Sequence, residues 1–262
     1  MTGPITNRMA LAEAIAQEAG QRALEYFNTR DALIIEDKAN PQDMVSQADQ
    51  EVELLLRTRI AANFPEDAIL GEEGGGTAGT SGFTWVLDPI DGTAPFLAGL
   101  PHWGVVIAIV EGGKTVAGVI EQPMAKEVFT ARAGAGAWIN GTPMQVGADM
   151  RVENCNIGAG ISYRTPRAPF MAFLDNLLEA GGMFYRNGSG AVMLASVAAG
   201  RLGGYYEPHM NPWDCLAGLL MVEEAGGRVL PFPALPDGGT VLAGTPIIFE
   251  HLSTMVDVSN RA

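Results

Sequence analysis

Two aspartates three residues apart, Asp88 and Asp91, follow the apolar run 85–87. That run is typical of a buried strand, and Pro89, which has no N–H for a ladder, predicts that the strand ends at Asp88. Paired carboxylates at a rigid strand end suit a hard divalent cation. The dipeptide Gly92-Thr93 then predicts a tight turn that opens a short helix, with N–H groups suited to a phosphate oxygen. This motif alone leaves an ordinary Asx turn as the alternative.

Two further carboxylates stand at predicted element boundaries. Glu72 follows a brief strand at 68–70, and Asp214 opens a predicted helix after Asn211-Pro212-Trp213. Taken alone, Asp214 is explained by the preference of the helix macrodipole for an acidic first turn. If all four carboxylates converge, however, they repel one another and raise their pKa values unless cations neutralise them. Such a cluster is typical of a two-metal phosphoryl-transfer site.

Composition narrows the class of protein. The 262 residues carry a formal net charge of −14, which argues against nucleic acid held by a basic patch. An acidic protein that handles phosphate is expected to do so through bound cations. No apolar run approaches the ~18 residues that span a bilayer, and the N-terminus does not resemble a signal peptide. Cys155 and Cys215 lack metal spacing and are predicted to be buried thiols, so we expect a cytoplasmic enzyme without a membrane partner.

The first half of the chain predicts helices that precede a run of strands. A long amphipathic helix is expected over 5–28 with Thr6 as its N-cap, and a second helix over 46–63. Residues 37–43 predict a polar loop with Pro41 inside it, and 74–82, rich in Gly, Ser and Thr, predicts another loop. Strands are predicted at 33–36, 68–70, 103–110, 115–120 and 128–131, and Asn140-Gly141 is a hairpin signal.

A new series of elements begins near Asp149. Strands are predicted at 155–161, 183–186 and 203–206 and near Val229 and Val241. Helices are predicted at 169–179, 190–199, 212–225 and 246–256. Helix layers and largely antiparallel sheets predict an α+β sandwich with two lobes, 1–150 carrying most of the metal ligands and 151–262 completing the substrate pocket.

Three separated motifs together resemble the inositol monophosphatase family, a superfamily of Mg²⁺-dependent, lithium-sensitive phosphatases. They are Gly71-Glu72-Glu73, the segment 85–93, and Trp213-Asp214 followed by Glu-Glu-Ala-Gly-Gly at 223–227. Lys38 and the segment 43–49 resemble the early part of that family. The resemblance runs from about residue 38 to 227 with the elements in the family's order. It implies a layered αβαβα sandwich, of the type shared with fructose bisphosphatase, and hydrolysis of small phosphate monoesters.

The resemblance also implies roles for individual residues. Two or three Mg²⁺ ions are expected per active site, one held by Glu72, Asp88 and the carbonyl of Ile90, a second by Asp88, Asp91 and Asp214. Thr93, with Glu72 nearby and Asp49 behind it, would orient the attacking water. The substrate would be bound by the following residues: Gly92, Thr93, Gly188, Ser189, Gly190, Glu207 and Lys38. Two departures from the family pattern, Ala94-Pro95 and Gly190, affect the substrate pocket and no metal ligand.

Inositol 1-phosphate is the leading substrate candidate, within the class of phosphorylated polyols and amino alcohols. The sequence Leu-Pro-His-Trp-Gly at 100–104 resembles the histidinol-phosphatase branch instead, so histidinol phosphate is the alternative. A different class of function remains open, because some bacterial relatives are thought to bind the transcription machinery without needing catalysis. The family resemblance further implies a homodimer.

Overall fold

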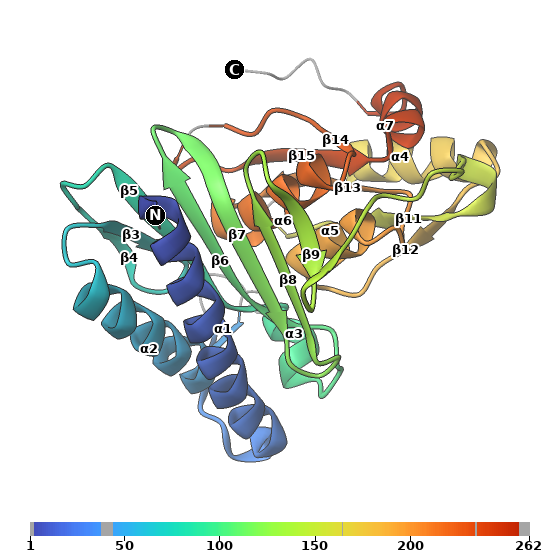
Figure 1. Cartoon of the computed structure of the whole chain (residues 1–262). Helices are drawn as coiled ribbons and strands as arrows, with labels where there is room; N and C mark the ends of the chain where they lie inside the picture. Colours follow the sequence, from blue (N-terminus) through green and yellow to red (C-terminus); the bar gives the residue numbers. More distant parts are fainter. Residues whose placement is uncertain (1–2, 38–43, 164, 234, 257–262) are drawn as a thin grey trace.

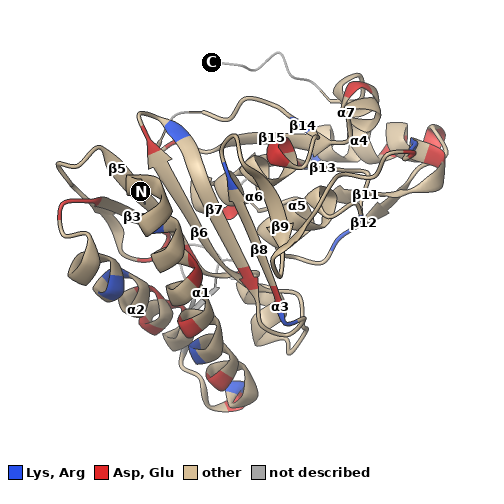
Figure 2. Cartoon of the chain, viewed as in Figure 1, with Lys and Arg blue, Asp and Glu red and all other residues tan. Residues whose placement is uncertain are grey.

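The computed structural model describes residues 3–37, 44–163, 165–233 and 235–256, and its helices and sheets alternate in layers (Figure 1). Among the described residues, no helix is both long enough and apolar enough to cross a bilayer. Acidic and basic residues are dispersed over many elements, and Lys and Arg are the fewer (Figure 2).

Two long helices form the first layer. These are α1 (Pro4–Asn28) and α2 (Gln47–Asn63), which bury apolar residues at helical spacing against the same sheet. The predicted N-cap Thr6 is wrong, because Pro4 begins the helix and Gly3 takes the cap position. Ser46 caps α2 and its hydroxyl accepts a hydrogen bond from the Ala48 amide. The short elements between the helices are η1 (Arg30–Ala32), β1 (Ile35–Asp37) and β2 (Met44–Ser46).

The second layer is an eight-stranded sheet in the order β10-β9-β8-β7-β6-β5-β3-β4. All neighbours are antiparallel except β3 and β5, which run parallel. The prediction of a loop over 74–82 is wrong in part, since 75–77 pair with β3. The strands are β3 (Ala68–Gly71), β4 (Gly75–Thr77), β5 (Phe83–Asp91), β6 (Gly104–Glu111), β7 (Lys114–Gln122), β8 (Glu127–Arg132), β9 (Gly136–Ile139) and β10 (Thr142–Pro143).

Strand β5 does not end at Asp88, which corrects the expectation drawn from Pro89. It continues to Asp91, with a register shift against β6 between Asp88 and Asp91. Pro89 lies inside this irregularity, where a missing N–H interrupts no regular ladder bond. The bulged strand end therefore delivers both aspartates from one strand, and α3 (Thr93–Leu97) follows as predicted. The hairpin at Asn140-Gly141 is also confirmed, with positive φ at both residues.

A middle helix layer separates this sheet from a second one. It consists of α5 (Gly190–Ala198) and α6 (Pro212–Glu224), whose buried residues share one core with both sheets. The second sheet has the order β12-β11-β13-β15-β14 and is mixed, because β12, β11 and β13 are parallel. Its strands are β11 (Asn156–Ala159), β12 (Met183–Tyr185), β13 (Gly204–Met210), β14 (Arg228–Val229) and β15 (Gly239–Gly244).

The fifth layer comprises α4 (Arg167–Glu179) and α7 (Pro246–Ser253), which pack on the outer face of the second sheet. The short η2 (Val152–Asn154) precedes β11. The predicted αβαβα sandwich is thereby confirmed. The first sheet draws its strands from residues 68–143 and the second from 156–244, while the two-lobe division stays a prediction. Both cysteines are free as expected, although Cys155 is only half-buried.

Candidate active site

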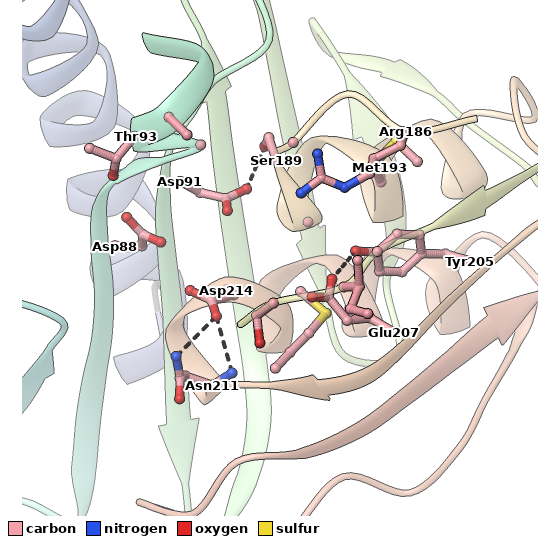
Figure 3. A pocket seen from close by; sticks show the side chains of 18 of the residues that line it. Asp88, Asp91, Thr93, Arg186, Ser189, Met193, Tyr205, Glu207, Asn211 and Asp214 are labelled. Carbon is pink, nitrogen blue, oxygen red and sulfur yellow. Dashed lines mark hydrogen bonds between the residues drawn. The ribbon is translucent and has the colours of Figure 1, made fainter. Parts of the chain in front are cut away.

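A cavity of about 600 Å³ lies where the first sheet, the middle helices and the second sheet meet (Figure 3). Its lining includes the bulged end of β5, the first turns of α5 and α6, and the outer half of β13. Most of the residues predicted for the site line this cavity: Glu72, Asp88, Ile90, Asp91, Gly92, Thr93, Gly188, Ser189, Gly190, Glu207 and Asp214. Lys38 lies outside the described residues.

Three of the predicted metal ligands converge. Glu72, Asp88 and Asp214 each offer one carboxylate oxygen, and these oxygens lie within 4.8 Å of one another. The pairing of β3 with β5 explains the first two, because Gly71 is opposite Leu87 and the residue that follows each of them in the chain is a predicted ligand. Asp214 stands at the third position of α6 and its carboxylate accepts a hydrogen bond from the Asn211 amide at 3.1 Å.

This carboxylate group is electrostatically unfavourable without a cation. Asp88 is 1% exposed, and burial raises its pKa well above the ordinary value, with further upward contributions from Glu72, Asp91 and Asp214. A bound divalent cation reverses that effect, because it favours the ionised carboxylates. The donor set consists of carboxylate oxygens, which fits Mg²⁺ and not a soft metal.

Asp91 lies beside this group and is bonded to the middle helix layer. Its carboxylate accepts a hydrogen bond from the Ser189 hydroxyl at 2.5 Å and from the Ala191 amide at 2.7 Å. Burial raises the pKa of Asp91 to about 7, and Asp214 adds to the shift. Its oxygens are not part of the three-oxygen group, so its predicted role as a metal ligand stays a prediction. The carbonyl oxygen of Ile90, which is expected to bind the other metal with Glu72 and Asp88, is one of two possible acceptors for the Thr93 hydroxyl proton.

Thr93 and Asp49 meet as the family pattern implies. The Thr93 hydroxyl lies 3.2 Å from Asp49 Oδ1 and 3.2 Å from the Ile90 carbonyl oxygen. Asp49 is 1% exposed, and Ser46 donates to its other oxygen from both the amide and the hydroxyl. Burial raises the pKa of Asp49, while these hydrogen bonds lower it. Gly92, at φ 95°, suits this turn because a Cβ there would lie 2.9 Å from the His102 carbonyl oxygen.

The opposite wall carries Glu207, which the sequence placed at a strand end. It lies within β13, next to a register shift that follows it. Tyr205, two residues earlier on the same face, donates its hydroxyl proton to Glu207, and burial raises the pKa of Glu207 to about 7. Gly160 makes room for this pair, since a Cβ there would lie 2.0 Å from Glu207 Oε2.

Sequence reasoning gave no role to several residues that line the cavity, among them Gly160, Arg186 and Tyr205. Tyr205 could have been found, because residues two apart on a strand share a face with Glu207. Arg186 reaches into the cavity from the segment between β12 and α5 (Figure 3), and its charge lowers the pKa of Glu207. Nothing local in the sequence distinguishes Gly160 from other glycines.

The chain is similar to known proteins over nearly its whole length. The model of the inositol monophosphatase family matches residues 6–250. The chain is 34% identical to Nus factor SuhB of Haemophilus influenzae over 251 residues, 93% of each chain. It is 35% identical to an inositol-1-monophosphatase of Rhizobium meliloti over 226 residues, which is 84% of this chain and 85% of that protein.

The fold of the chain is also similar to those of solved structures. The crystal structure of the extragenic suppressor protein suhB from Bartonella henselae superposes with a TM-score of 0.89 at 33% identity, over 96% of this chain and 99% of that one. With matches over nearly the whole length in sequence and structure, the chain belongs to the inositol monophosphatase family.

Proposed function

We propose that this protein is a Mg²⁺-dependent phosphatase of small phosphate monoesters. The observation that carries the proposal is the convergence of Glu72, Asp88 and Asp214 within 4.8 Å, beside a Thr93–Asp49 pair of which Asp49 is buried. Hard oxygen ligands, a hydroxyl in the cavity wall and a cavity large enough for a small ester are what such a reaction needs.

The residues of the chain then have separate tasks. Glu72, Asp88, Asp91, Asp214 and the Ile90 carbonyl would hold two or three Mg²⁺ ions. Bound Mg²⁺ supplies a Lewis acid and a lowered pKa for water. Thr93 orients the attacking water, since Asp49 can accept the threonine proton and leave the hydroxyl oxygen as an acceptor. Glu72 stands close to that water, and Gly92 and Thr93 contact the phosphate.

Inositol 1-phosphate remains the leading substrate, because Glu207 lines the same cavity as the metal ligands and can accept two hydroxyl hydrogen bonds. Gly188, Ser189 and Gly190 form the neighbouring wall. Histidinol phosphate is the competing substrate, since the carboxylate of Glu207 is equally suited to bind the cationic amine of that molecule. Arg186 on the same wall favours ligands that tolerate a nearby cation.

The experiment is phosphate release from a panel of monoesters, with Mg²⁺ and with EDTA. We expect EDTA to abolish release and added Mg²⁺ to restore it, with the highest kcat/KM for inositol 1-phosphate. Full activity in EDTA would refute the metal mechanism, and preference for histidinol phosphate would replace the substrate. Lithium inhibition is a further expectation from family membership.

A second function is supported by the names of relatives. The H. influenzae protein, similar over 93% of its length, is a Nus factor. We therefore keep the alternative that this chain binds the transcription machinery of the cytoplasm. Purified RNA polymerase should then retain both the wild-type protein and Asp91→Asn, because binding would not need catalysis. If RNA polymerase retains neither protein and the wild type still has phosphatase activity, only the enzymatic function stands.

We also infer a homodimer. Strand β12 forms an edge of the second sheet, and its three residues, Met183, Phe184 and Tyr185, are all exposed. Exposed Met171 and Leu178 of α4, which contacts β12, extend this apolar surface. Sedimentation should give a dimer for the wild type and a monomer for Phe184→Glu.

A further inference from the structure

Glu53 is a buried carboxylate that has no assigned task in the site described above. It lies on α2, one turn after Asp49, and is 2% exposed. Its Oε2 accepts a hydrogen bond from the Glu73 amide at 2.8 Å, and its Oε1 accepts one from the Gly74 amide at 2.8 Å. These two amides belong to the turn between β3 and β4, directly after Glu72.

Arg57, one helical turn further along α2, completes the contact. Its Nε donates to Glu53 Oε1 at 2.6 Å, and its guanidinium also donates to the Gly75 carbonyl at 2.5 Å. The Glu53–Arg57 ion pair thus binds the turn at two places: Glu53 accepts from the amides of Glu73 and Gly74, and Arg57 donates to the carbonyl of Gly75. The turn needs such support, because 74–76 are three glycines and β4 is an exposed edge strand.

The turn is also shaped around this carboxylate. A Cβ at Gly71 would lie 2.4 Å from Glu53 Oε1, and one at Gly74 would lie 2.7 Å from the same atom. Glycines therefore flank Glu72 and Glu73 at the two positions where a side chain would displace Glu53. The close approach makes the backbone around Glu72 dependent on a group of another element.

We propose that Glu53, held by Arg57, is a positioning residue that fixes Glu72 in the three-oxygen group with Asp88 and Asp214. The inference rests on the proposed function in that the group is taken to bind a cation. Residues that orient a ligand through a second contact commonly change metal affinity 10–100-fold when replaced. Glu53 acts through two backbone amides, so the loss of its charge loosens the ligand without removing it.

The test compares Glu53→Gln with Glu51→Gln on the same helix. Glu51 bonds to Arg22, Tyr26 and Gln47, all away from the turn. Mn²⁺ titration followed by electron paramagnetic resonance should show affinity weakened about 10–100-fold for Glu53→Gln and unchanged for Glu51→Gln. In metal-free protein, hydrogen exchange at the Glu73 and Gly74 amides should accelerate in the first variant only.

Wild-type Mn²⁺ affinity and wild-type amide exchange in folded Glu53→Gln would overturn the proposal, as would an equal loss in Glu51→Gln. If Glu53→Gln does not fold, Arg57→Gln serves instead, with Arg59→Gln of the exposed Arg59–Glu18 pair as its control. If the wild type binds no Mn²⁺ and releases no phosphate, the proposed function fails. Amide exchange still decides whether Glu53 holds the turn, so the two failures are distinguishable.

Discussion

The Ser189 hydroxyl donates to the carboxylate of Asp91, 98 residues earlier in the chain, at a distance of 2.5 Å. The same hydroxyl oxygen accepts the Val192 amide and so caps α5. One side chain therefore joins the end of β5 in the first sheet to the middle helix layer. The bond also fixes the direction of Asp91 relative to Asp214, whose charge raises the Asp91 pKa.

Replacing Ser189 by alanine removes both the cap and a hydrogen bond to a buried acid. We expect the free energy of unfolding to fall by about 1–3 kcal/mol. Chemical denaturation of the metal-free protein measures this. Thr245→Ala, which removes the corresponding cap of α7 far from any carboxylate of the site, should lose only about 1 kcal/mol. Equal losses in the two variants would mean that the bond to Asp91 contributes nothing.

Asp91→Asn tests whether the Asp91 carboxylate takes part in catalysis or only in the structure at the end of β5. Asparagine retains an oxygen that can accept from Ser189, so the fold should persist with an unchanged circular dichroism spectrum. We expect kcat to fall about 10²-fold or more, because a charge is lost where leaving-group charge develops. Steady-state kinetics at saturating Mg²⁺ measures it. A kcat near that of the wild type would show that Asp91 has only a structural role at the end of β5.

Asp67 connects helix α1 of the first layer to strand β5 of the first sheet. It accepts two hydrogen bonds from the buried Arg8 guanidinium, at 2.6 and 2.7 Å, and one from the Trp85 indole. Asp67→Ala leaves that guanidinium buried and unpaired, so the free energy of unfolding should fall by about 3–5 kcal/mol. Arg59→Ala breaks an exposed pair that solvent screens, so the free energy of unfolding should change far less. Thermal denaturation at fixed pH distinguishes the two.

Glu121 predicts how stability changes with pH. It lies on β7 against Gly20 of α1, is 9% exposed, and its Oε2 has no hydrogen-bond partner among the described residues. Burial raises its pKa from 4.5 to about 7. The folded state therefore binds more protons than the unfolded state between these values, and the free energy of unfolding falls as pH rises from 4.5 to 7.

Replacing Glu121 by glutamine should flatten this decline. The control is Glu127→Gln on the neighbouring strand β8, whose half-buried carboxylate pairs with Arg201. Urea unfolding of both variants and the wild type at pH 5 and pH 8 measures the difference, which we expect to shrink by about 1–3 kcal/mol in Glu121→Gln alone. An unchanged difference would show that Glu121 does not titrate in this range.

The local parts of the site could be predicted from the sequence. Asp88, Asp91 and Thr93 belong to one motif of six residues, and Asp214 follows a proline that starts a helix. The positions that depend on strand pairing could not be predicted from local patterns, and only the family resemblance implied them. That Glu72 lies beside Asp88 follows from the parallel pairing of β3 with β5, which no short-range pattern contains. The continuation of β5 past Pro89 likewise depends on its register with β6.

Residues that contact the backbone of another element could not be predicted from the sequence either. Glu53 occupies an ordinary position in an amphipathic helix, where glutamate predicts a solvated face, yet it is buried under the β3–β4 turn. The same holds for 75–77, where glycines indicate a loop and pairing with β3 makes a strand. In both cases a tertiary contact outweighs the local preference.

Thr93 and Glu207 should separate chemistry from recognition. Thr93 contacts Asp49 on one wall of the cavity, whereas Glu207 lies with Tyr205 on the opposite wall. Thr93→Ala should slow all phosphate esters by a similar factor, about 10²-fold or more, because all of them share one attacking water. Glu207→Gln should reduce kcat/KM for a polyol phosphate by a factor that corresponds to about 1–3 kcal/mol of transition-state binding. The reason is that one acceptor oxygen becomes a donor.

A minimal ester such as p-nitrophenyl phosphate makes no hydroxyl contacts and should be hydrolysed by Glu207→Gln almost as by the wild type. The measurement is kcat/KM of both variants on both types of ester, at saturating Mg²⁺ and at pH 8. The pKa of about 7 makes Glu207 largely ionised at this pH, so the substitution removes a charge. If Glu207→Gln slows the minimal ester as much as the polyol phosphate, Glu207 supports the metal ligands or the fold, and the substrate's alcohol lies elsewhere in the cavity.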